Sequence, residues 1–434
     1  MKGALFGASR EGLFFLYVEG EMSSGLLLKE VRGDRLVVAI DPGKVLNRVW
    51  LTTGERGLIG EPVSLPVLRD GVDELERLVA RSGVDGPPVI GIEATGALHR
   101  AWAAEVERRW PGSLRLFAPS ETQAARAQLG SRRFKTDDRD CAALVWLLRQ
   151  GAGRPAGPSG VEALLGAVRH RRQLVDARRV AQQRLHDQLN ALCPGLSAPV
   201  GHGRVLELAD PSGRAVLGCA VAFAGRAPSV RSLVARAPGR LSDANARFWA
   251  QRWKRLLAPP ADAELRAQRL GRDVDRWLGL REDIAALESQ LAELLAGTDG
   301  QILTTLPGVA AVRAAAFAAH TLPIERWPTP EHLYSATGLA PASYQSATVT
   351  RRGRISRQGL PEHRDALMGI AWGLAQHSPA FAARHHELRA RGFRPIPARV
   401  ALARHACRLA WRLMISQQPY DDRRYDRARH RRGR

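Results

Sequence analysis

The spacing of apolar residues divides the chain into regions with different predicted structure. In the first 150 residues, two β-branched runs, "RLVVAIDPG" (35–43) and "PPVIGIEATG" (87–96), flank an amphipathic stretch, "GVDELERLVARSG" (71–83). Short apolar runs that end in a turn sequence are typical of buried strands, and the stretch between them is typical of a helix. Another helix is predicted in "TDDRDCAALVWLLRQ" (136–150). This alternation predicts an α/β sheet.

A longer helical period follows in the middle of the chain. Positions 270, 273, 277, 280, 284, 287, 291 and 294 hold Leu, Asp, Trp, Leu, Ile, Leu, Leu and Leu, a seam that is interrupted only at Asp273. A basic helix over about 161–192 ends in leucines at similar spacing, at Leu185, Leu189 and Leu192. We expect the two helices to form a helical hairpin or a coiled coil, for packing or dimerisation. The Arg-rich stretch at about 194–260 is irregular and is left unassigned.

Shifts in composition mark the expected domain boundaries. "GAGRPAGPSG" (151–160) is rich in Gly and Pro and predicts a linker after an α/β domain at 31–150. A helical and coiled-coil region is expected at 161–298, including the unassigned insert, and a mainly α-helical domain at 299–418. Residues 1–30 form an extension without a usable motif, and residues 419–434 form a basic tail. Such a tail attracts nucleic acid without specificity.

A Pro-Gly turn opens the last domain. In "ILTTLPGVAAVRAAAFAAH" (302–320) this turn lies between two helical stretches, which is the helix–hairpin–helix pattern. In that pattern the backbone N–H groups at a helix start can face a phosphate. A plain turn between two helices explains the same residues equally well.

The charge balance indicates a polyanionic partner. The chain has 65 Lys and Arg against 43 Asp and Glu, a net charge of +22, and nucleic acid is the commonest partner of so basic a protein. A GC-rich genome would explain the use of Arg in place of Lys, but not the net excess. Four cysteines lie far apart without a CxxC pair, which argues against a zinc site or a disulfide framework and fits a reducing cytoplasm. The apolar run "LFFLYV" (13–18) is too short to span a membrane.

Four carboxylates occupy positions where catalysis could use them. Asp41 and Glu93 end the two predicted strands, and the carboxyl ends of strands face the functional crevice of open α/β sheets. Asp137 and Asp140 are three apart on a predicted helix and therefore share one face. Each has an ordinary explanation, since Asp-Pro-Gly is a common turn and Asp137 can cap its helix. Jointly, they could hold two Mg²⁺ ions for phosphoryl transfer.

A serine lies ahead of a cluster of arginines near the C-terminal end. The stretch "YQSATVTRRGRISRQG" (344–359) has no hydrophobic period, so it is expected to be an exposed loop. Ser346 is either an ordinary polar residue or a reactive hydroxyl in a phosphate-attracting segment. The nearby arginines could bind phosphates; they are Arg351, Arg352, Arg354 and Arg357. A serine hydrolase is excluded because no G-x-S-x-G elbow occurs.

Several of these blocks resemble one known family. "AIDPG", "GIEATG" and "KTDDRDC" resemble the Asp, Glu and Asp-x-x-Asp blocks of the DEDD transposases of bacterial insertion sequences, which are bridge-RNA-guided recombinases. "LPGVAAVRAAAF", "YSATGLAPASYQSATVTRRGRISRQG" and "HRDALMGIAW" resemble the second transposase domain of that family. The resemblance covers roughly 35–150 and 300–415, with matching order and spacing.

The resemblance implies a fold, a site and partners. The N-terminal domain would be RuvC-like, an RNase H-like α/β fold, and its carboxylates would bind Mg²⁺, two ions per site. The expected ligands, which are also catalytic, are Asp41, Glu93, Asp137 and Asp140, with Asp138 as their non-ligand neighbour. Ser346 would attack a DNA phosphate and form a covalent phosphoserine link, while Lys135 and the four arginines bind nucleic acid.

The implied partners are donor DNA, target DNA and a non-coding guide RNA that the element encodes. A homo-oligomer, a dimer or tetramer with composite active sites, is also implied, as is a bacterial cytoplasmic location at the nucleoid with no membrane association.

The chain departs from the family pattern, and residues 1–30 and about 194–260 have no counterpart in it. Ala347 stands where glycine usually follows the serine, and "RQGLPEHR" (357–364) replaces a more usual Lys-Arg-Gly-Asn pattern. Two other interpretations therefore stay open. One is a RuvC-like, structure-specific nuclease of DNA junctions that uses the acidic site alone. The other is a non-catalytic nucleic-acid-binding remnant.

Overall fold

The computed structural model describes residues 35–53, 57–58, 61–129, 136–155, 159–197, 205–346 and 349–422, with only the backbone of 57–58, 343–346 and 349–352. The chain divides into two compact units, Met1–Gly157 and Pro158–Arg434. This division falls within the stretch whose composition suggested a linker. The extension at 1–30 and nearly all of the basic tail lie outside the described residues. Among the described helices, none combines the length and the hydrophobicity that a membrane span requires.

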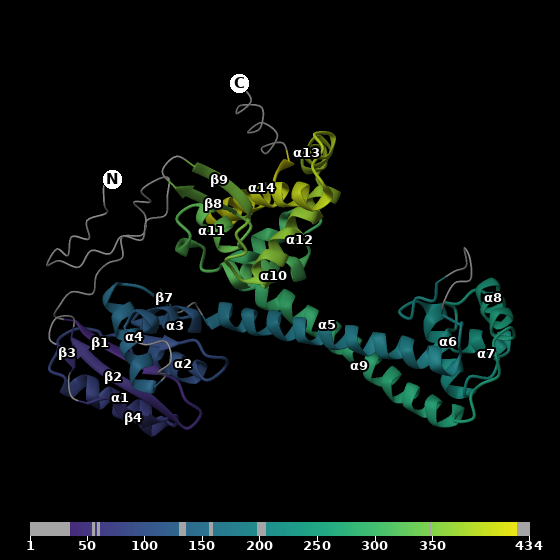
Figure 1. Ribbon diagram of the computed structural model, residues 1–434, viewed down its shortest axis with the longest axis horizontal. Coiled ribbons are helices and arrows are strands. Elements are labelled where there is room, and N and C mark those ends of the chain that lie inside the picture. Colours follow the sequence, from purple (N-terminus) through teal and green to yellow (C-terminus); the bar gives the residue numbers. More distant parts are fainter. Residues whose placement is uncertain are drawn as a thin grey trace. The chain divides into compact units, whose positions relative to one another are not determined.

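The first unit is built on a mixed sheet (Figure 1). Its strand order is β3 (Gly57–Leu58), β2 (Leu46–Thr53), β1 (Leu36–Asp41), β5 (Val89–Glu93), β6 (Leu114–Phe117) and β7 (Arg154–Pro155), and β4 (Val63–Pro66) also pairs with β2. β1, β5 and β6 are parallel, whereas β2 is antiparallel to β1. This arrangement is consistent with the RuvC-like domain that the sequence predicted, although the antiparallel strands β2 to β4 were not foreseen.

Helices cover both faces of this sheet. Leu36, Val38 and Ile40 of β1 pack in one core with α1 (Arg69–Arg81) and α2 (His99–Arg109). Val37 and Ala39 point to the opposite face, where α4 (Asp137–Arg149) packs against them. α3 (Pro119–Gln128) packs on α4. The predicted strands at 35–43 and 87–96 and the predicted helices at 71–83 and 136–150 are confirmed.

The second unit contains two long helices that pack against each other, α5 (Ser159–Leu192) and α9 (Ala263–Ala296). They are antiparallel, because Arg171 near the start of α5 binds Glu288 near the end of α9. Asp273, the polar residue in the apolar seam, is hydrogen-bonded between the two helices, because Gln188 Nε2 donates to Asp273 Oδ2 over 2.6 Å. The predicted helical hairpin is therefore confirmed, and dimerisation through it stays a prediction.

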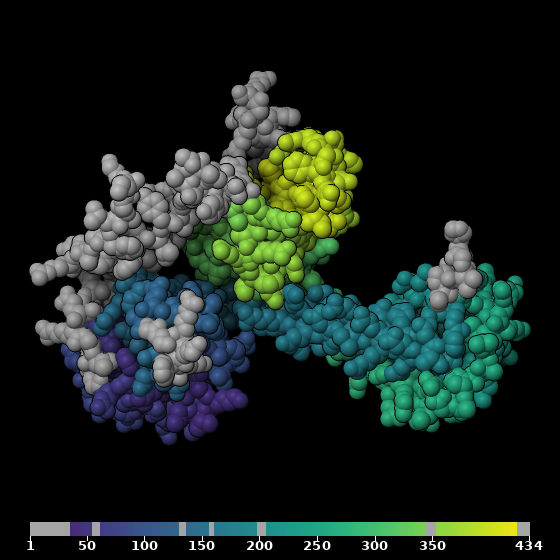
Figure 2. Space-filling model, viewed as in Figure 1, coloured from purple at the N-terminus to yellow at the C-terminus, as the bar shows by residue number. Residues whose placement is uncertain are grey.

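The Arg-rich stretch at about 194–260, which the sequence left unassigned, contains helices in its described part. Three short helices, α6 (Pro211–Ala222), α7 (Val230–Ala235) and α8 (Asp243–Trp253), form a lobe at one end of the α5–α9 hairpin (Figure 2). Trp249 and Trp253 pack there with Trp277 of α9 in a separate core. Ser229 and Ser242 cap α7 and α8 by accepting backbone N–H bonds. Helices of this length show too few turns for a clear period, and their stability comes from packing on the long helices.

A second core lies at the other end of the α5–α9 hairpin. It joins the start of α5 and the end of α9 to η1 (Asp299–Thr305), α10 (Ala311–Thr321), η2 (Ile324–Arg326), α11 (Pro330–Ala336), α12 (Pro361–His377), α13 (Pro379–Ala390) and α14 (Pro395–Ser416). The predicted Pro-Gly turn lies between η1 and α10. Gly308 has a φ of +72°, and a Cβ there would lie 2.7 Å from the carbonyl oxygen of Gly373 in α12. Only glycine fits both constraints.

The expectation of a loop at 344–359 is wrong for most of that stretch. β8 (Pro341–Ser346) and β9 (Val349–Ile355) form an antiparallel hairpin in which Ser346 pairs with Val349. Backbone hydrogen bonds hold this hairpin, and every residue type except proline can make them. Polar residues fill most positions of both strands, so no alternation of apolar and polar residues predicts these strands.

Candidate active-site carboxylates and the serine hairpin

Asp41 and Glu93 lie at neighbouring strand ends in the first unit. Ile40 of β1 is in register with Ile92 of β5, and the two carboxylates come directly after this pair. Side chains alternate between the faces of a strand, and Ala39 lies on the face covered by α4. Asp41 and Glu93, each two residues beyond a position on that face, therefore project on the side of α4. Both are half-buried.

The start of α4 is held against this strand edge. Arg48 of β2 is in register with Asp41, and its backbone carbonyl accepts a bond from the Cys141 thiol, with the two atoms 3.3 Å apart. Burial raises the pKa of the Cys141 thiol, and the negative charge of Asp41 raises it further. Since Asp41 is in register with Arg48, whose carbonyl binds Cys141, Asp41 lies near the start of α4. Residues far apart in sequence thus meet at one edge of the sheet.

The first turn of α4 carries three acidic residues with different surroundings. Thr136 begins the helix by accepting a bond from the backbone N–H of Arg139 over 3.3 Å. Asp137 and Asp138 are exposed, whereas Asp140 is buried. Negative charge in the first turn stabilises a helix through its dipole, so part of this acidity is explained without catalysis. The helix dipole does not explain why Asp140 is buried, because an exposed charge in the first turn interacts with the dipole as well.

Two arginines compensate these carboxylates, and sequence reasoning missed both. Arg126 of α3 forms an ion pair with Oδ1 of Asp140, and the side chains are 15% and 5% exposed. Arg48 Nε binds Oδ1 of Asp138 at 2.6 Å, and this bond raises the pKa of the guanidinium. Neither arginine lies at a motif spacing from its partner. Only the packing of α3 on α4 and of β2 beside β1 brings them into place.

The carboxylates fit Mg²⁺ in chemical type, since hard oxygen donors are what this ion prefers. They are not gathered into a ready ligand set: among the described residues, no group of three His, Cys, Asp or Glu side chains could hold a metal ion as it stands. In addition, Arg126 occupies an oxygen of Asp140. Glu93 also accepts a bond from the hydroxyl of Thr95. A metal would therefore have to exchange with these partners.

Ser346 lies in the second unit, at the tip of the β8–β9 hairpin. Two residues connect it to Val349, its partner in the register. The base of the hairpin is tied to the preceding turn, because the backbone N–H groups of Ser356 and Arg357 donate to the carbonyls of Ala340 and Gly338 at 2.8 and 3.0 Å.

The predicted phosphate-binding residues are placed only in part. Arg354 and Arg357 are exposed, and Arg357 has a φ of +57°, a left-handed conformation at the end of the hairpin. Arg351 and Arg352 pair with Tyr344 and Ser343 in the strand register, and their side chains are not among those described. Lys135 lies outside the described residues.

One comparison with known proteins identifies a class of domain. Residues 300–386 match the model of a transposase family, a segment that runs from η1 through the serine hairpin into α13. The family is described as "Transposase IS116/IS110/IS902 family". The match supports a transposase or recombinase of an insertion sequence, whose substrate is DNA. The first unit lies outside the matched residues, and no curated protein matches the chain.

Proposed function

We propose that this protein is an RNA-guided DNA recombinase of an insertion sequence that cuts and rejoins DNA through a covalent link to Ser346. The observation that carries the proposal is that the segment matching a transposase family contains the hairpin with Ser346 near its tip. Support from the other unit is the placement of Asp41 and Glu93 at neighbouring strand ends, with the acidic start of α4 held beside the same edge of the sheet. Either feature alone has an ordinary explanation, whereas both are needed for this chemistry.

In the proposed reaction the Ser346 hydroxyl attacks a DNA phosphodiester. The bond between Oγ and phosphorus forms as the bond from phosphorus to a sugar oxygen breaks; the hydroxyl gives up its proton and the sugar oxygen gains one. Because the phosphoserine diester keeps the energy of the broken linkage, a sugar hydroxyl of another strand can reverse the step and rejoin DNA. The arginines on and after β9, with Arg354 and Arg357 exposed, would bind the flanking phosphates.

The acidic edge would serve the same reaction. Asp41, Glu93, Asp137 and Asp140 would hold Mg²⁺, which when bound polarises phosphate oxygens and offsets the charge that develops on them. Asp138, paired with Arg48, would not be a ligand. In the metal-free protein, Arg48 and Arg126 neutralise part of the acidic edge, which would otherwise repel itself.

Guide RNA and oligomerisation complete the proposal. A net charge of +22 suits a protein that holds nucleic-acid backbones, and sequence would be read by base pairing between the guide RNA and both DNAs. We propose composite sites in which one protomer supplies carboxylates and another supplies the serine. Mixing an Asp41→Ala protein with a Ser346→Ala protein would then restore some recombination, because mixed oligomers contain one intact composite site.

The central test is the protein–DNA adduct. The protein is incubated with the RNA of its element and labelled DNA containing the element ends, and adducts are detected after denaturing electrophoresis. Ser346→Ala should abolish the adduct and the recombination, while Ser343→Ala, a control in the same strand, should keep both. Recombination that survives Ser346→Ala would refute the serine mechanism.

The same experiment separates the alternatives. A junction nuclease would keep Mg²⁺-dependent strand cleavage in the Ser346→Ala protein and lose it in the Asp41→Ala protein. A non-catalytic remnant would bind nucleic acid and show no cleavage in any variant.

A further inference from the structure

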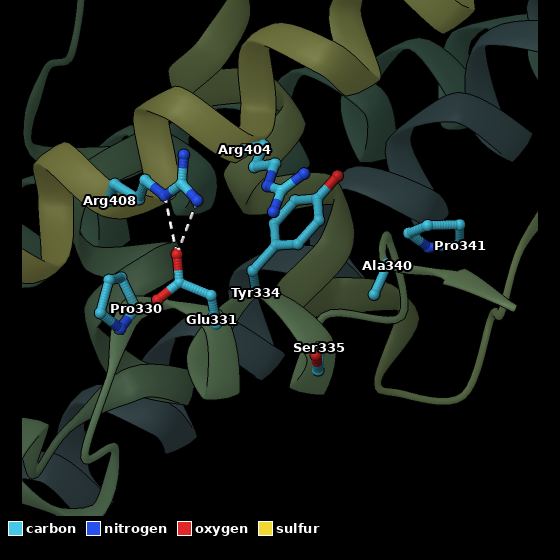
Figure 3. Close-up of a pocket in the computed structure, with 8 residues that line it drawn as sticks. All are labelled: Pro330, Glu331, Tyr334, Ser335, Ala340, Pro341, Arg404 and Arg408. Carbon is cyan, nitrogen blue, oxygen red and sulfur yellow. Dashed lines mark hydrogen bonds and ion pairs between the residues drawn. The ribbon is translucent and has the colours of Figure 1, made fainter. Parts of the chain in front are cut away.

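A pocket that the reaction does not use lies beside the serine hairpin in the second unit. It has a volume of about 290 Å³ and lies between α11, the start of β8 and α14 (Figure 3). Pro330, Tyr334, Ala340 and Pro341 form its apolar wall, and its polar lining consists of Glu331, Ser335, Arg404 and Arg408. This volume is at the lower end of the range for small-molecule sites, so the pocket suits one small group and not a duplex.

The two arginines of the pocket are in different states. Arg408 uses Nε and Nη2 to bind the same oxygen of Glu331, at 2.8 and 2.7 Å, and so ties α14 to α11. Arg404, one turn earlier on α14, is exposed and has no hydrogen bond or ion pair with any described residue. Figure 3 shows its guanidinium beside the ring of Tyr334. Two guanidinium groups against one carboxylate leave the pocket with a net positive charge.

The position of the pocket suggests what it binds. Pro341 lines the pocket and is the first residue of β8, and Ser346 is the last. Five steps along a strand, at about 3.3 Å each, separate the pocket wall from the serine by at most about 17 Å, because the register shifts between Pro341 and Ser343. This is roughly the length of five stacked nucleotides at 3.4 Å each. Pro341 is also in register with Ile355, so the exposed Arg354 lies next to the same end of the hairpin.

We propose that this pocket binds one backbone phosphate of a single nucleic-acid strand, with Arg404 as the main ligand and the sugar against the apolar wall. Resting on the proposed function, it would anchor the strand whose linkage Ser346 attacks, a few nucleotides from that linkage. Glu331 lowers the net positive charge of the pocket through its ion pair with Arg408. The bound phosphate can therefore exchange. A bidentate guanidinium suits a phosphate better than an ammonium does.

The test measures binding without chemistry. The full chain with Ser346→Ala is titrated against a fluorescein-labelled single-stranded oligonucleotide over a series of salt concentrations, read by fluorescence anisotropy. Losing one phosphate contact makes the slope of log K against log salt less steep by about 0.7. Between about 1 M and 0.1 M salt, the variant should therefore gain about fivefold less affinity than the parent protein. Arg404→Gln should show this loss, and Arg404→Lys should keep most of the slope.

The control and the opposite change come from the same region. Arg412→Gln removes the same charge from an exposed position on α14, about 12 Å further along the helix, and should leave the slope nearly unchanged. Glu331→Gln should tighten binding, because it releases Arg408. Thermal melting of each variant checks that α11 and α14 remain packed.

The inference is wrong if Arg404→Gln and Arg412→Gln bind the oligonucleotide alike. Thermal melting with and without inorganic phosphate gives a second outcome. The inference is also wrong if Arg404→Gln removes only the thermal stabilisation by inorganic phosphate and leaves oligonucleotide binding unchanged, because the pocket would then hold a free small anion. Both outcomes leave the proposed function untouched, since that depends on the adduct formed with Ser346 intact.

Discussion

The ion pair between Arg126 and Asp140 gives the sharpest prediction about the acidic edge. If Asp140 is a metal ligand, Arg126 is its counter-ion in the metal-free protein, and Mg²⁺ must compete with it. The substitution Arg126→Gln should then make the first unit depend on the ion. Removing the guanidinium leaves a carboxylate that is only 5% exposed without its partner.

The size of the effect follows from this burial. Breaking a buried ion pair by removing one partner costs about 3–5 kcal/mol in the free energy of unfolding. In the variant, a cation that binds Asp140 replaces the lost charge, so Mg²⁺ should recover part of that cost. In the wild-type protein the same ion has to displace Arg126 and should stabilise the fold less. The variant should also bind the ion more tightly.

The assay is urea unfolding of the full chain, with Mg²⁺ or with EDTA, followed by a probe in the first unit. A control exists on the opposite face of the sheet, where Arg109 is only 10% exposed and pairs with Asp73 and Glu76. Arg109→Gln should destabilise the unit equally with and without Mg²⁺. If Arg126→Gln also shows the same loss in both solutions, Asp140 does not bind the metal in the free protein.

Two further predictions follow from single groups. Asp137→Asn should abolish Mg²⁺-dependent DNA cleavage. Asp138 lies next to it and pairs with Arg48, so Asp138→Asn should lower the cleavage rate by at most about tenfold. Equal losses of rate in a cleavage time course would contradict the ligand assignment. In the second unit, burial first, and then the charges of neighbouring groups, lower the pKa of His320 to about 4 and of His363 to about 3. Because these imidazoles resist protonation in the fold and accept it when unfolded, stability is full above about pH 6.5 and should fall by up to about 1.4 kcal/mol per pH unit for each histidine as the pH drops toward 4. Urea midpoints measured across this range for the wild-type protein and for His363→Gln check the effect; a variant with undiminished acid sensitivity would refute it.

Local patterns determined the elements that carry their own signal. The strands that end in Asp41 and Glu93 are runs of buried apolar residues, and the α5–α9 hairpin has a long three-four seam. Such periods reflect which side chains leave water, a property that is written residue by residue. The strand ends and the helix start that carry the four candidate carboxylates can therefore be predicted from the amino-acid sequence alone.

Tertiary structure decided what depends on pairing. The β8–β9 hairpin is built from backbone hydrogen bonds, which polar residues make as well as apolar ones, so a stretch without a period still became two strands. Arg126 and Arg48 find Asp140 and Asp138 because α3 packs on α4 and β2 lies beside β1. The short helices α6 to α8 gain their stability from the ends of α5 and α9. Each of these outcomes needs the contact of two separate segments, and the free energy of that contact is encoded in neither segment alone.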